Sequence, residues 1–283
     1  MPVFKPAGCP QGPLLVVNPG GRLGNKICQY LTLWVLSEAI TGVQARILSP
    51  MYEKLRRHFE DRRQVSLLSD RCSAAISWQK VSMGDEKTFG ARLAAGESLH
   101  VTGGPCPVSR FYARREEALA QLVWRANVSR EAERRLARAP NGTRTYIGVH
   151  VRRTDYAEWL RDKIHGHLVS PAYLRCALRH ARRTYPRPAF LVSSDDMAWC
   201  RTHIVGDDVM FVGSDASEAF DMATLGMCNH TIVTYGTFGY MSAFLAGGDV
   251  IVPTGYSKVE YSLVGHLRQA RLNVTQLKDS DEC

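Results

Sequence analysis

The chain has 283 residues, 22% of them charged, and Lys plus Arg exceed Asp plus Glu by 36 to 27. This is the composition of an ordinary globular protein, which excludes a disordered, collagen-like or low-complexity chain. The net charge of +9 favours an anionic partner. Nucleic acid is not expected, because no basic stripe with interleaved aromatic residues occurs, whereas a small molecule that carries phosphate fits the charge.

The first half opens with a strand, a glycine-containing loop and a helix. Residues 14–17 form a short apolar run, residues 18–21 interrupt it, and apolar side chains over 27–39 follow a helical period. Such a unit brings backbone N–H groups and a helix N-terminus to the mouth of a sheet, where anions or sugars often bind. A second strand is predicted over 45–48, and residues 51–140 are Arg-rich and mostly helical in pattern.

From residue 144 onward, predicted strands alternate with predicted helices. The strands are expected over 145–151, 189–192, 209–212, 231–235 and 249–252. The helices are expected over 171–184, 217–228 and 238–245, the first with Ser170 as its N-cap. This alternation is typical of βαβ units and a parallel sheet. We expect an α/β protein with an irregular N-terminal lobe over 1–143 and a more regular C-terminal lobe over 144–283.

Three polar loops follow predicted strands at their carboxyl ends, where ligands of parallel sheets bind. They are His150-Val-Arg-Arg-Thr-Asp-Tyr156, Ser193-Ser-Asp-Asp196 and Gly236-Thr-Phe-Gly239. An arginine in this position can grip a diphosphate with its planar set of donors. Since neighbouring side chains of a strand face opposite ways, we expect one of Arg152 and Arg153 to touch the ligand and the other to pair with a carboxylate such as Asp155. The alternative is that both arginines are surface charges.

Neither a metal site nor a familiar nucleotide loop is expected. Of nine histidines, only His165 and His167 are closely spaced, and no cysteine or carboxylate cluster accompanies them. The Asp-x-Asp pair Asp279 and Asp281 lies in a polar tail, so we interpret it as solvated charge. Residues 20–26 have the wrong spacing for a P-loop. The charge of a diphosphate would therefore be met by Arg side chains and backbone N–H groups.

Cysteines and glycosylation sequons bear on the compartment. Eight cysteines without a C-x-x-C pair leave both disulfides and buried thiols open. Four Asn-X-Ser/Thr sequons are candidates for glycosylation and favour a secretory compartment, namely those at Asn127, Asn141, Asn229 and Asn273. The sequence contains no signal-peptide h-region and no apolar run long enough to span a membrane.

Three motifs together carry a resemblance to a known family. They are Gly21-Arg-Leu-Gly-Asn25, His150-Val-Arg-Arg-Thr-Asp-Tyr156, and Cys228 to Gly239 followed by Ala246-Gly-Gly-Asp249. In this order they resemble the GDP-fucose-dependent galactoside α-1,2-fucosyltransferases over about residues 14–252. The resemblance implies a GT-B-like fold with two Rossmann-like lobes. It also implies an inverting, metal-independent transfer of L-fucose from GDP-fucose to the 2-OH of a terminal β-galactoside, in a Golgi-lumenal type II protein whose membrane anchor is absent from this chain.

The resemblance also implies a donor site. Its residues, carried over by position, are His150, Arg152, Arg153, Asp221, Thr237 and Phe238. Arg152 would contact the β-phosphate of GDP and offset the charge of the leaving group, which elsewhere is the work of a metal. His150 and Asp221 would face the guanosine, and Thr237 with its neighbouring N–H groups the diphosphate.

The acceptor side and the catalytic base are expected in two other loops. The N-terminal loop 19–25 would face the galactoside through Gly21, Arg22, Gly24 and Asn25. Inversion calls for a base opposite the leaving group, and Asp155 is the first candidate and Glu158 the second. A structural Asp155, hydrogen-bonded within its own loop, is the alternative.

Three other functional interpretations stay open. Thr154 stands where the α-1,2 family usually has Gly, and the related α-1,6-fucosyltransferases share the His-x-Arg-Arg-x-Asp loop, so an α-1,6-like specificity is one. A catalytically inactive glycan- or GDP-sugar-binding protein of the same fold is the second, because the family's usual C-terminal segment is not matched beyond Val252. The third is an unrelated cytosolic nucleotide-dependent enzyme, which is supported only by an N-terminal sequence without the apolar h-region of a signal peptide.

Overall fold

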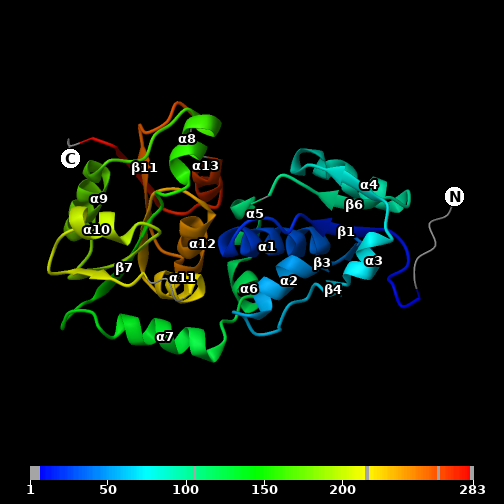
Figure 1. Cartoon of the computed structure of the whole chain (residues 1–283), viewed down its shortest axis with the longest axis horizontal. Coiled ribbons are helices and arrows are strands. Elements are labelled where there is room, and N and C mark those ends of the chain that lie inside the picture. Colours follow the sequence, from blue (N-terminus) through cyan, green and yellow to red (C-terminus); the bar gives the residue numbers. More distant parts are fainter. Residues whose placement is uncertain (1–6, 105, 214–216, 260–261, 281–283) are drawn as a thin grey trace. The chain divides into compact units, whose positions relative to one another are not determined.

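The computed structural model describes residues 7–104, 106–213, 217–259 and 262–280. The chain divides into two compact units, Met1–Val123 and Trp124–Cys283. Each unit is built of helices around a parallel sheet (Figure 1). The α/β class expected from the sequence is therefore confirmed. No helix in these described ranges is long and apolar enough to cross a membrane.

The boundary between the units lies earlier than the expected break between residues 143 and 144. The reason is helix α7 (Ala126–Leu136), which packs against α11 (Glu218–Gly226) of the second unit. A buried ion pair joins the two helices, with Arg135 Nη1 2.8 Å from Asp221 Oδ1. Such a long-range contact leaves no mark on the local pattern from which the boundary was predicted.

The sheet of the first unit has four parallel strands in the order β2-β1-β6-β5. They are β1 (Leu14–Val17), β2 (Gln44–Ala45), β5 (Trp78–Val81) and β6 (Ser98–Val101), and a separate parallel pair consists of β3 (Ile47–Leu48) and β4 (Leu67–Leu68). The first predicted strand is confirmed. The strand expected over 45–48 is divided, because its halves pair with different sheets. Residues 51–140, expected to be mostly helical, also contain β4, β5 and β6.

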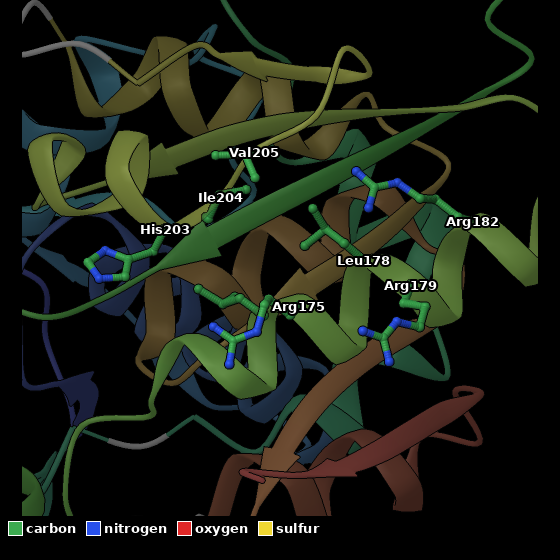
Figure 2. A pocket seen from close by; sticks show the side chains of 8 residues that line it. Arg175, Leu178, Arg179, Arg182, His203, Ile204 and Val205 are labelled. Atoms are coloured by element: carbon green, nitrogen blue, oxygen red, sulfur yellow. The ribbon is translucent and has the colours of Figure 1, made fainter. Parts of the chain in front are cut away.

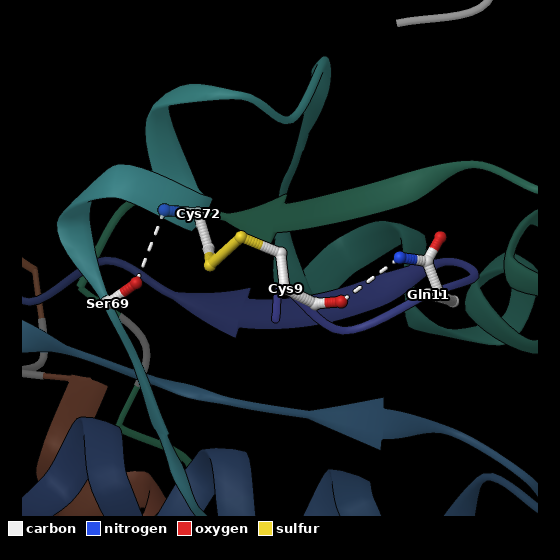
Figure 3. The surroundings of a disulfide bond; sticks show 4 residues. All are labelled: Cys9, Gln11, Ser69 and Cys72. Atoms are coloured by element: carbon white, nitrogen blue, oxygen red, sulfur yellow. Dashed lines mark hydrogen bonds between the residues drawn. A yellow bond between two sulfur atoms is a disulfide. The ribbon is translucent and has the colours of Figure 1, made fainter. Parts of the chain in front are cut away.

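Helices and disulfides complete the first unit. The helices are α1 (Leu23–Ala39), α2 (Ser49–Arg56), α3 (Asp70–Ala74), a 3₁₀ helix (Met83–Thr88), α4 (Phe89–Ala94), α5 (Val108–Tyr112) and α6 (Arg115–Ala120). One disulfide, Cys9–Cys72, joins the segment before β1 to α3 (Figure 3), and a second joins Cys28 of α1 to Cys106. In the second unit, Cys200 and Cys228 are buried thiols. Both interpretations of the cysteines therefore apply, each to different residues.

The second unit contains one parallel sheet of six strands in the order β12-β11-β10-β7-β8-β9. The strands are β7 (Thr145–Val151), β8 (Pro188–Ser194), β9 (Val209–Phe211), β10 (His230–Val233), β11 (Val250–Thr254) and β12 (Val274–Lys278). All five strands predicted for this half are present, and β12 is an additional edge strand. The central strands are buried on both faces, as a sheet covered by helices requires.

The helices of this unit, α7 and α11 apart, are α8 (Tyr156–Ile164), α9 (Pro171–Thr184), α10 (Met197–His203), α12 (Thr237–Ala246) and α13 (Ser262–Gln269). Helix α9 begins and ends where the sequence predicts, and the Ser170 hydroxyl accepts the N–H of Ala172. This cap is itself held by Asp279, which accepts hydrogen bonds from the N–H and hydroxyl of Ser170 at 3.0 and 2.6 Å.

The expectation that Asp279 is a solvated charge is wrong. Its side chain is only 2% exposed. Strand β12 pairs with β11 and thereby returns the chain to the N-terminus of α9, where Asp279 binds Ser170. The other member of the Asp-x-Asp pair, Asp281, lies outside the described residues.

Candidate active site

The order of the strands selects one edge of the second sheet. From β7 the chain proceeds to β8 and β9 on one side, and then crosses to β10 and β11 on the other side of β7. The carboxyl ends of β7 and β10 thus flank a topological switch point, the crevice in which open α/β sheets bind their ligands. The Arg152 loop follows β7, and Gly236 with Thr237 follows β10. The third polar segment, Ser193 to Asp196, begins in the last two residues of β8 and continues beyond it, and β8 pairs with β7.

Arg152 is held between two carboxylates. Its Nη2 donates to Asp155 Oδ1 at 2.5 Å, and its Nη1 lies 3.2 Å from Asp195 Oδ2. The guanidinium also lies 5.6 Å from the centre of the Tyr156 ring, and the Arg152 backbone N–H donates to the Thr234 hydroxyl at 3.0 Å. With its side chain only 14% exposed, Arg152 is a positioned group rather than a solvated surface charge.

Arg153 contacts a different set of groups. Its guanidinium lies 3.7 Å from the centre of the Trp199 ring on α10, and its Nε is 3.6 Å from Asp196 Oδ2. The expected division of roles between the two arginines therefore needs one correction. Asp155 pairs with Arg152, whereas Arg153 pairs with Asp196 after β8. Stacking on an indole face suits Arg153 to anchor its loop against α10.

His150, the last residue but one of β7, is buried at 5% exposure. Its ring stacks on Phe238 at a centroid distance of 4.9 Å. Burial lowers the pKa of His150 from 6.5 to about 4, so the ring is neutral at physiological pH. A Cβ atom on Gly239 would lie 2.7 Å from His150 Nδ1, so this packing requires a glycine at 239. The structure thus brings together His150 and Phe238, two of the predicted donor residues.

The N-terminus of α12 lies beside the same loop. Gly236 precedes the helix with φ of +89°, and a Cβ there would lie 3.0 Å from the Tyr156 hydroxyl. No side chain caps the helix, which starts at Thr237. Since Arg152 also lies over the Tyr156 ring, the positive end of the helix dipole and a guanidinium meet around one residue. This is an arrangement for binding an anion.

Asp221 is engaged by protein groups on both carboxylate oxygens. Oδ1 accepts from Arg135 Nη1 at 2.8 Å, and Oδ2 accepts from the Ser193 hydroxyl at 2.7 Å. Arg135 Nε in turn donates to Glu131 at 2.8 Å. These bonds join α7, α11 and the carboxyl end of β8. Contact of Asp221 with guanosine stays a prediction, and its structural role was not foreseen.

The N-terminal loop is a folded turn of the first unit. The N–H of Asn18 donates to the carbonyl of Val101 at 2.8 Å, and Lys26 Nζ donates to the carbonyl of Pro19. Gly21 has φ of +77°, and a Cβ there would lie 2.0 Å from Asn25 Nδ2, so only glycine fits. Arg22 is exposed and Gly24 is buried at the start of α1. The acceptor role of this loop stays a prediction.

The two candidate bases lie near each other in sequence at the start of α8. Asp155 is 53% exposed and bound to Arg152, which agrees with the alternative of an Asp155 that is hydrogen-bonded within its own loop. Glu158 is exposed in the first turn of α8. No group of three or more His, Cys, Asp or Glu side chains suited to a metal ion occurs in the described part of the chain.

The four sequon asparagines are all exposed. Asn127 lies in the first turn of α7, and Asn141 lies in a turn before β7. Asn229 Oδ1 accepts the N–H of Tyr146 at 2.8 Å, and Asn273 Nδ2 donates to Asp249 Oδ1 at 3.0 Å. Two sequons therefore take part in hydrogen bonds near the amino ends of strands β7, β11 and β12.

Sequence reasoning named the Ser193–Asp196 loop but did not single out Asp195, and it missed Thr234 and Tyr156 as contacts of Arg152. Each lies near the end of a predicted strand, and this position could have marked them as candidate site residues. Their contacts could not be predicted from the sequence, because Asp195 and Arg152 are 43 positions apart and meet only through the pairing of β7 with β8.

Cavities lined by described residues of the second unit include one against α9 and one beyond β11. The larger, about 230 Å³, lies against α9 and the end of α10 (Figure 2), with Leu178 and Ile204 among its apolar walls and Arg175, Arg179 and Arg182 also lining it. The smaller, about 160 Å³, lies beyond the carboxyl end of β11 and is lined by Pro253, Thr254, Gly255, Tyr256, Ser257, Val264 and Gln276. Neither includes Arg152.

The fold of the chain is similar to solved fucosyltransferase structures. Arabidopsis thaliana FUT1, solved as a mutant in complex with GDP, aligns with a TM-score of 0.56 at 13% identity, covering 88% of this chain and 73% of that one. NodZ α-1,6-fucosyltransferase soaked with GDP-fucose, an enzyme from Bradyrhizobium, aligns with a TM-score of 0.52 at 17% identity, covering 83% and 93%. These neighbours support the expected GT-B-like fold class.

Comparison with sequence families is more specific. The model of glycosyl transferase family 11 matches residues 9–261. Galactoside 2-alpha-L-fucosyltransferase SEC1 of Bos taurus is 38% identical over 256 residues, covering 88% of this chain and 69% of the relative. Galactoside alpha-(1,2)-fucosyltransferase 2 of Bos taurus is 38% identical over 248 residues, covering 85% and 71%. The chain therefore belongs to glycosyl transferase family 11, among the galactoside α-(1,2)-fucosyltransferases, as its motifs predict.

Proposed function

We propose that the chain transfers L-fucose from GDP-fucose to the 2-OH of a terminal β-galactoside, with inversion and without a metal ion. The names of the curated relatives support this activity, and the solved neighbours with GDP or GDP-fucose support the donor. The observation that carries the proposal is the meeting of Arg152 and the N-terminus of α12 at the switch point of the sheet.

Arg152 would bind the β-phosphate of the donor through its planar set of N–H groups. In the structure, Nη2 of Arg152 is paired with the exposed Asp155, and Nη1 with Asp195, whose side chain is 15% exposed. Donor binding would replace the exposed partner, because a water-accessible carboxylate gives up an ion pair at little cost. The diphosphate would then lie on Nη2 while Asp195 continues to hold Nη1.

Bond cleavage would leave negative charge on GDP as the sugar gains oxocarbenium character. Arg152 and the dipole of α12 are fixed in place before this charge develops, so they would stabilise the transition state more than the ground state. A positive group beside the β-phosphate takes the role that a divalent metal has in other sugar-nucleotide enzymes. Metal independence of the transfer follows from this assignment as part of the proposal.

Inversion requires that the acceptor hydroxyl attack from the face opposite the departing GDP. A carboxylate on that side would take its proton, and Asp155 is our first choice, with Glu158 second.

The remaining donor contacts would hold the nucleoside and the pyrophosphate. The neutral ring of His150, stacked on Phe238, would face the guanosine. Asp221, whose place in the sequence matches the family's motif, would accept from a guanine N–H. Thr237 and the adjacent N–H groups would bind the diphosphate, and Arg153 would keep the loop in place.

The first unit would supply the acceptor site. Its loop after β1 is rigid through Gly21 and the bonds of Asn18 and Lys26. Arg22 and Asn25 would then present donors and acceptors to the hydroxyl groups of a galactoside, with Gly21 and Gly24 allowing close approach.

Product analysis tests the proposal. The chain is incubated with GDP-fucose and a panel of galactosides in excess EDTA, and the linkage and anomeric configuration of any product are determined by NMR. We expect an α-1,2 linkage at undiminished rate. An α-1,6 product would reassign the specificity, and a strict Mn²⁺ requirement would contradict the role of Arg152. GDP binding without any transfer would identify an inactive binding protein instead.

We also propose that the chain works in the Golgi lumen. The disulfides Cys9–Cys72 and Cys28–Cys106 support an oxidising secretory compartment. Glycans at Asn127, Asn141, Asn229 and Asn273 would be consistent with their exposure. Mass spectrometry of glycopeptides from the protein expressed in mammalian cells tests this, and unmodified asparagines at all four sequons would argue against a lumenal location.

A further inference from the structure

The carboxylate of Asp195 accepts several hydrogen bonds from the loop that follows β7. Asp195 follows β8 at the position next to Arg152 after β7, since Val151 and Ser194 are register partners. Its Oδ1 accepts the backbone N–H of Arg153 at 2.8 Å. Its Oδ2 accepts the backbone N–H and the hydroxyl of Thr154 at 3.1 and 2.5 Å, and lies 3.2 Å from Arg152 Nη1.

We propose that Asp195 is a positioning residue for the donor, which sets the geometry of Arg152 through its loop and through Nη1. The inference rests on the proposed function, in which Arg152 binds the β-phosphate. Asp195 is mostly buried, and both its oxygens are committed to three consecutive residues of the loop. It therefore acts through Arg152 and not as a base or a ligand of the sugar.

The two carboxylates on Arg152 have different tasks in this account. Asp155 belongs to the same loop as Arg152 and is exposed, so it moves with the loop and can be displaced. Asp195 directly follows another strand, β8, whose pairing with β7 holds it in place. It can therefore fix the position of the Arg152 guanidinium independently of the loop. A guanidinium already held on Nη1 loses less freedom when Nη2 meets a phosphate, and this preorganisation strengthens binding.

Thr154 adds a contact that glycine could not make. Its hydroxyl donates to Asp195 Oδ2, in addition to its backbone N–H. The loop of this chain is thus tied to β8 by one more hydrogen bond than a glycine at 154 would allow. Thr154→Val removes only the hydroxyl at nearly constant volume, and Thr154→Ser keeps it, so this pair isolates the side-chain bond.

Isothermal titration with GDP measures the effect on the donor site directly. We expect Asp195→Asn to weaken GDP binding about tenfold, close to the lower end of the range for loss of hydrogen bonds to a charged group. Asp208→Asn is the matched control, because Asp208 also pairs with an arginine, Arg182, at 2.7 Å. Asp208 directly precedes β9 and so lies at the amino end of that strand, whereas the proposed donor site lies at the carboxyl ends. The Asp208→Asn variant should bind GDP like the wild type. Unchanged affinity in Asp195→Asn would overturn the inference.

A double-mutant cycle separates positioning from general destabilisation. In an Arg152→Ala background, Asp195→Asn should change GDP affinity by less than about twofold, because the group that it positions is gone. Full additivity of the two losses would overturn the inference. If Asp195→Asn does not fold, the Thr154 pair decides: Thr154→Val should weaken GDP binding about threefold while Thr154→Ser retains it, and equal affinities would refute the role.

The readouts also distinguish this inference from the proposed function. GDP affinity is measured without fucose transfer, and transfer to a galactoside is assayed on the same samples. Normal GDP binding without transfer in the wild type contradicts the proposed activity and leaves the role of Asp195 supported if its variant binds GDP tenfold more weakly. Transfer by the wild type with unaltered GDP affinity in Asp195→Asn contradicts the positioning role alone.

Discussion

Adjacent residues of one loop have different surroundings, and these underlie the proposed donor site. Arg152 lies between the carboxylates of Asp155 and Asp195, whereas Arg153 stacks on Trp199. The sequence indicated that only one of the two arginines would meet a ligand, because neighbouring side chains diverge. It could not indicate which carboxylate each arginine would bind, because Asp195 and Asp196 reach the loop only through the pairing of β8 with β7.

Replacing Asp155 by Asn tests its catalytic role. We expect Asp155→Asn to lower kcat by about 10²–10⁴ if Asp155 is the base. GDP binding should be retained, since the variant removes a charge that competes for Arg152. Steady-state kinetics and calorimetry on the same sample check both statements. Weaker GDP binding together with a lower melting temperature would show that Asp155 only holds the loop.

His150 gives the protein a specific pH dependence. Its pKa is about 4 in the folded state and about 6.5 when unfolded, because burial opposes the charged ring. The unfolded state therefore binds more protons between these values, so stability is complete above about pH 6.5 and falls as the pH drops toward 4. The loss reaches about 3 kcal/mol by linkage.

Chemical denaturation at several pH values checks the contribution of His150. His150→Phe keeps an aromatic ring against Phe238 but cannot be protonated, so the difference in unfolding free energy between variant and wild type should change across pH 4–6.5. A difference that stays constant over this range would contradict a neutral, buried His150.

Helices and strands were predictable where a short-range pattern decides them. Strand β7 and helix α9 have the expected bounds, because an unbroken apolar run and a serine cap with proline after it are local signals. Strand β5 was missed because its middle residues are exposed at a sheet edge, and β12 because its sequence is polar. Asp279, which binds the α9 cap, depends on β12 and could not be foreseen.

The buried ion pair between Arg135 of α7 and Asp221 of α11 should dominate the stability of this part of the second unit. Arg135→Met leaves Asp221 buried without its ion partner, which typically costs about 3–5 kcal/mol. Arg134→Met is the control, because the Arg134 side chain is 76% exposed and its pair with Glu131 contributes below about 1 kcal/mol. Equal unfolding free energies of the two variants, measured in urea, would contradict a large stabilising contribution from the buried ion pair.

At the scale of the whole molecule, disulfides contribute to the stability of the first unit. Cys9–Cys72 and Cys28–Cys106 lie there and close long loops, with sequence separations of 63 and 78. By the entropy of loop closure each contributes about 4 kcal/mol. Strand β6 of this unit escaped prediction because residues 98–101 lie within the Arg-rich stretch 51–140, whose pattern indicated helices.

Removing one disulfide should therefore affect one unit. We expect the double variant Cys9→Ser, Cys72→Ser to lose hydrogen-exchange protection over residues 7–123, while β7 to β11 keep theirs as an internal control. Exchange measured by mass spectrometry resolves the two regions. Equal loss in both units would show that the disulfide stabilises the molecule as a whole.

The central claim is that Arg152 at the switch point binds the diphosphate of the donor, and GDP titration of Arg152 variants tests it most directly. Loss of a charge-assisted bidentate contact costs about 1.5–3 kcal/mol, so Arg152→Ala should weaken GDP binding by about 10- to 150-fold. Arg152→Lys should recover little, because an ammonium lacks the planar pair of donors. GDP affinity in Arg152→Ala equal to that of the wild type would contradict the account.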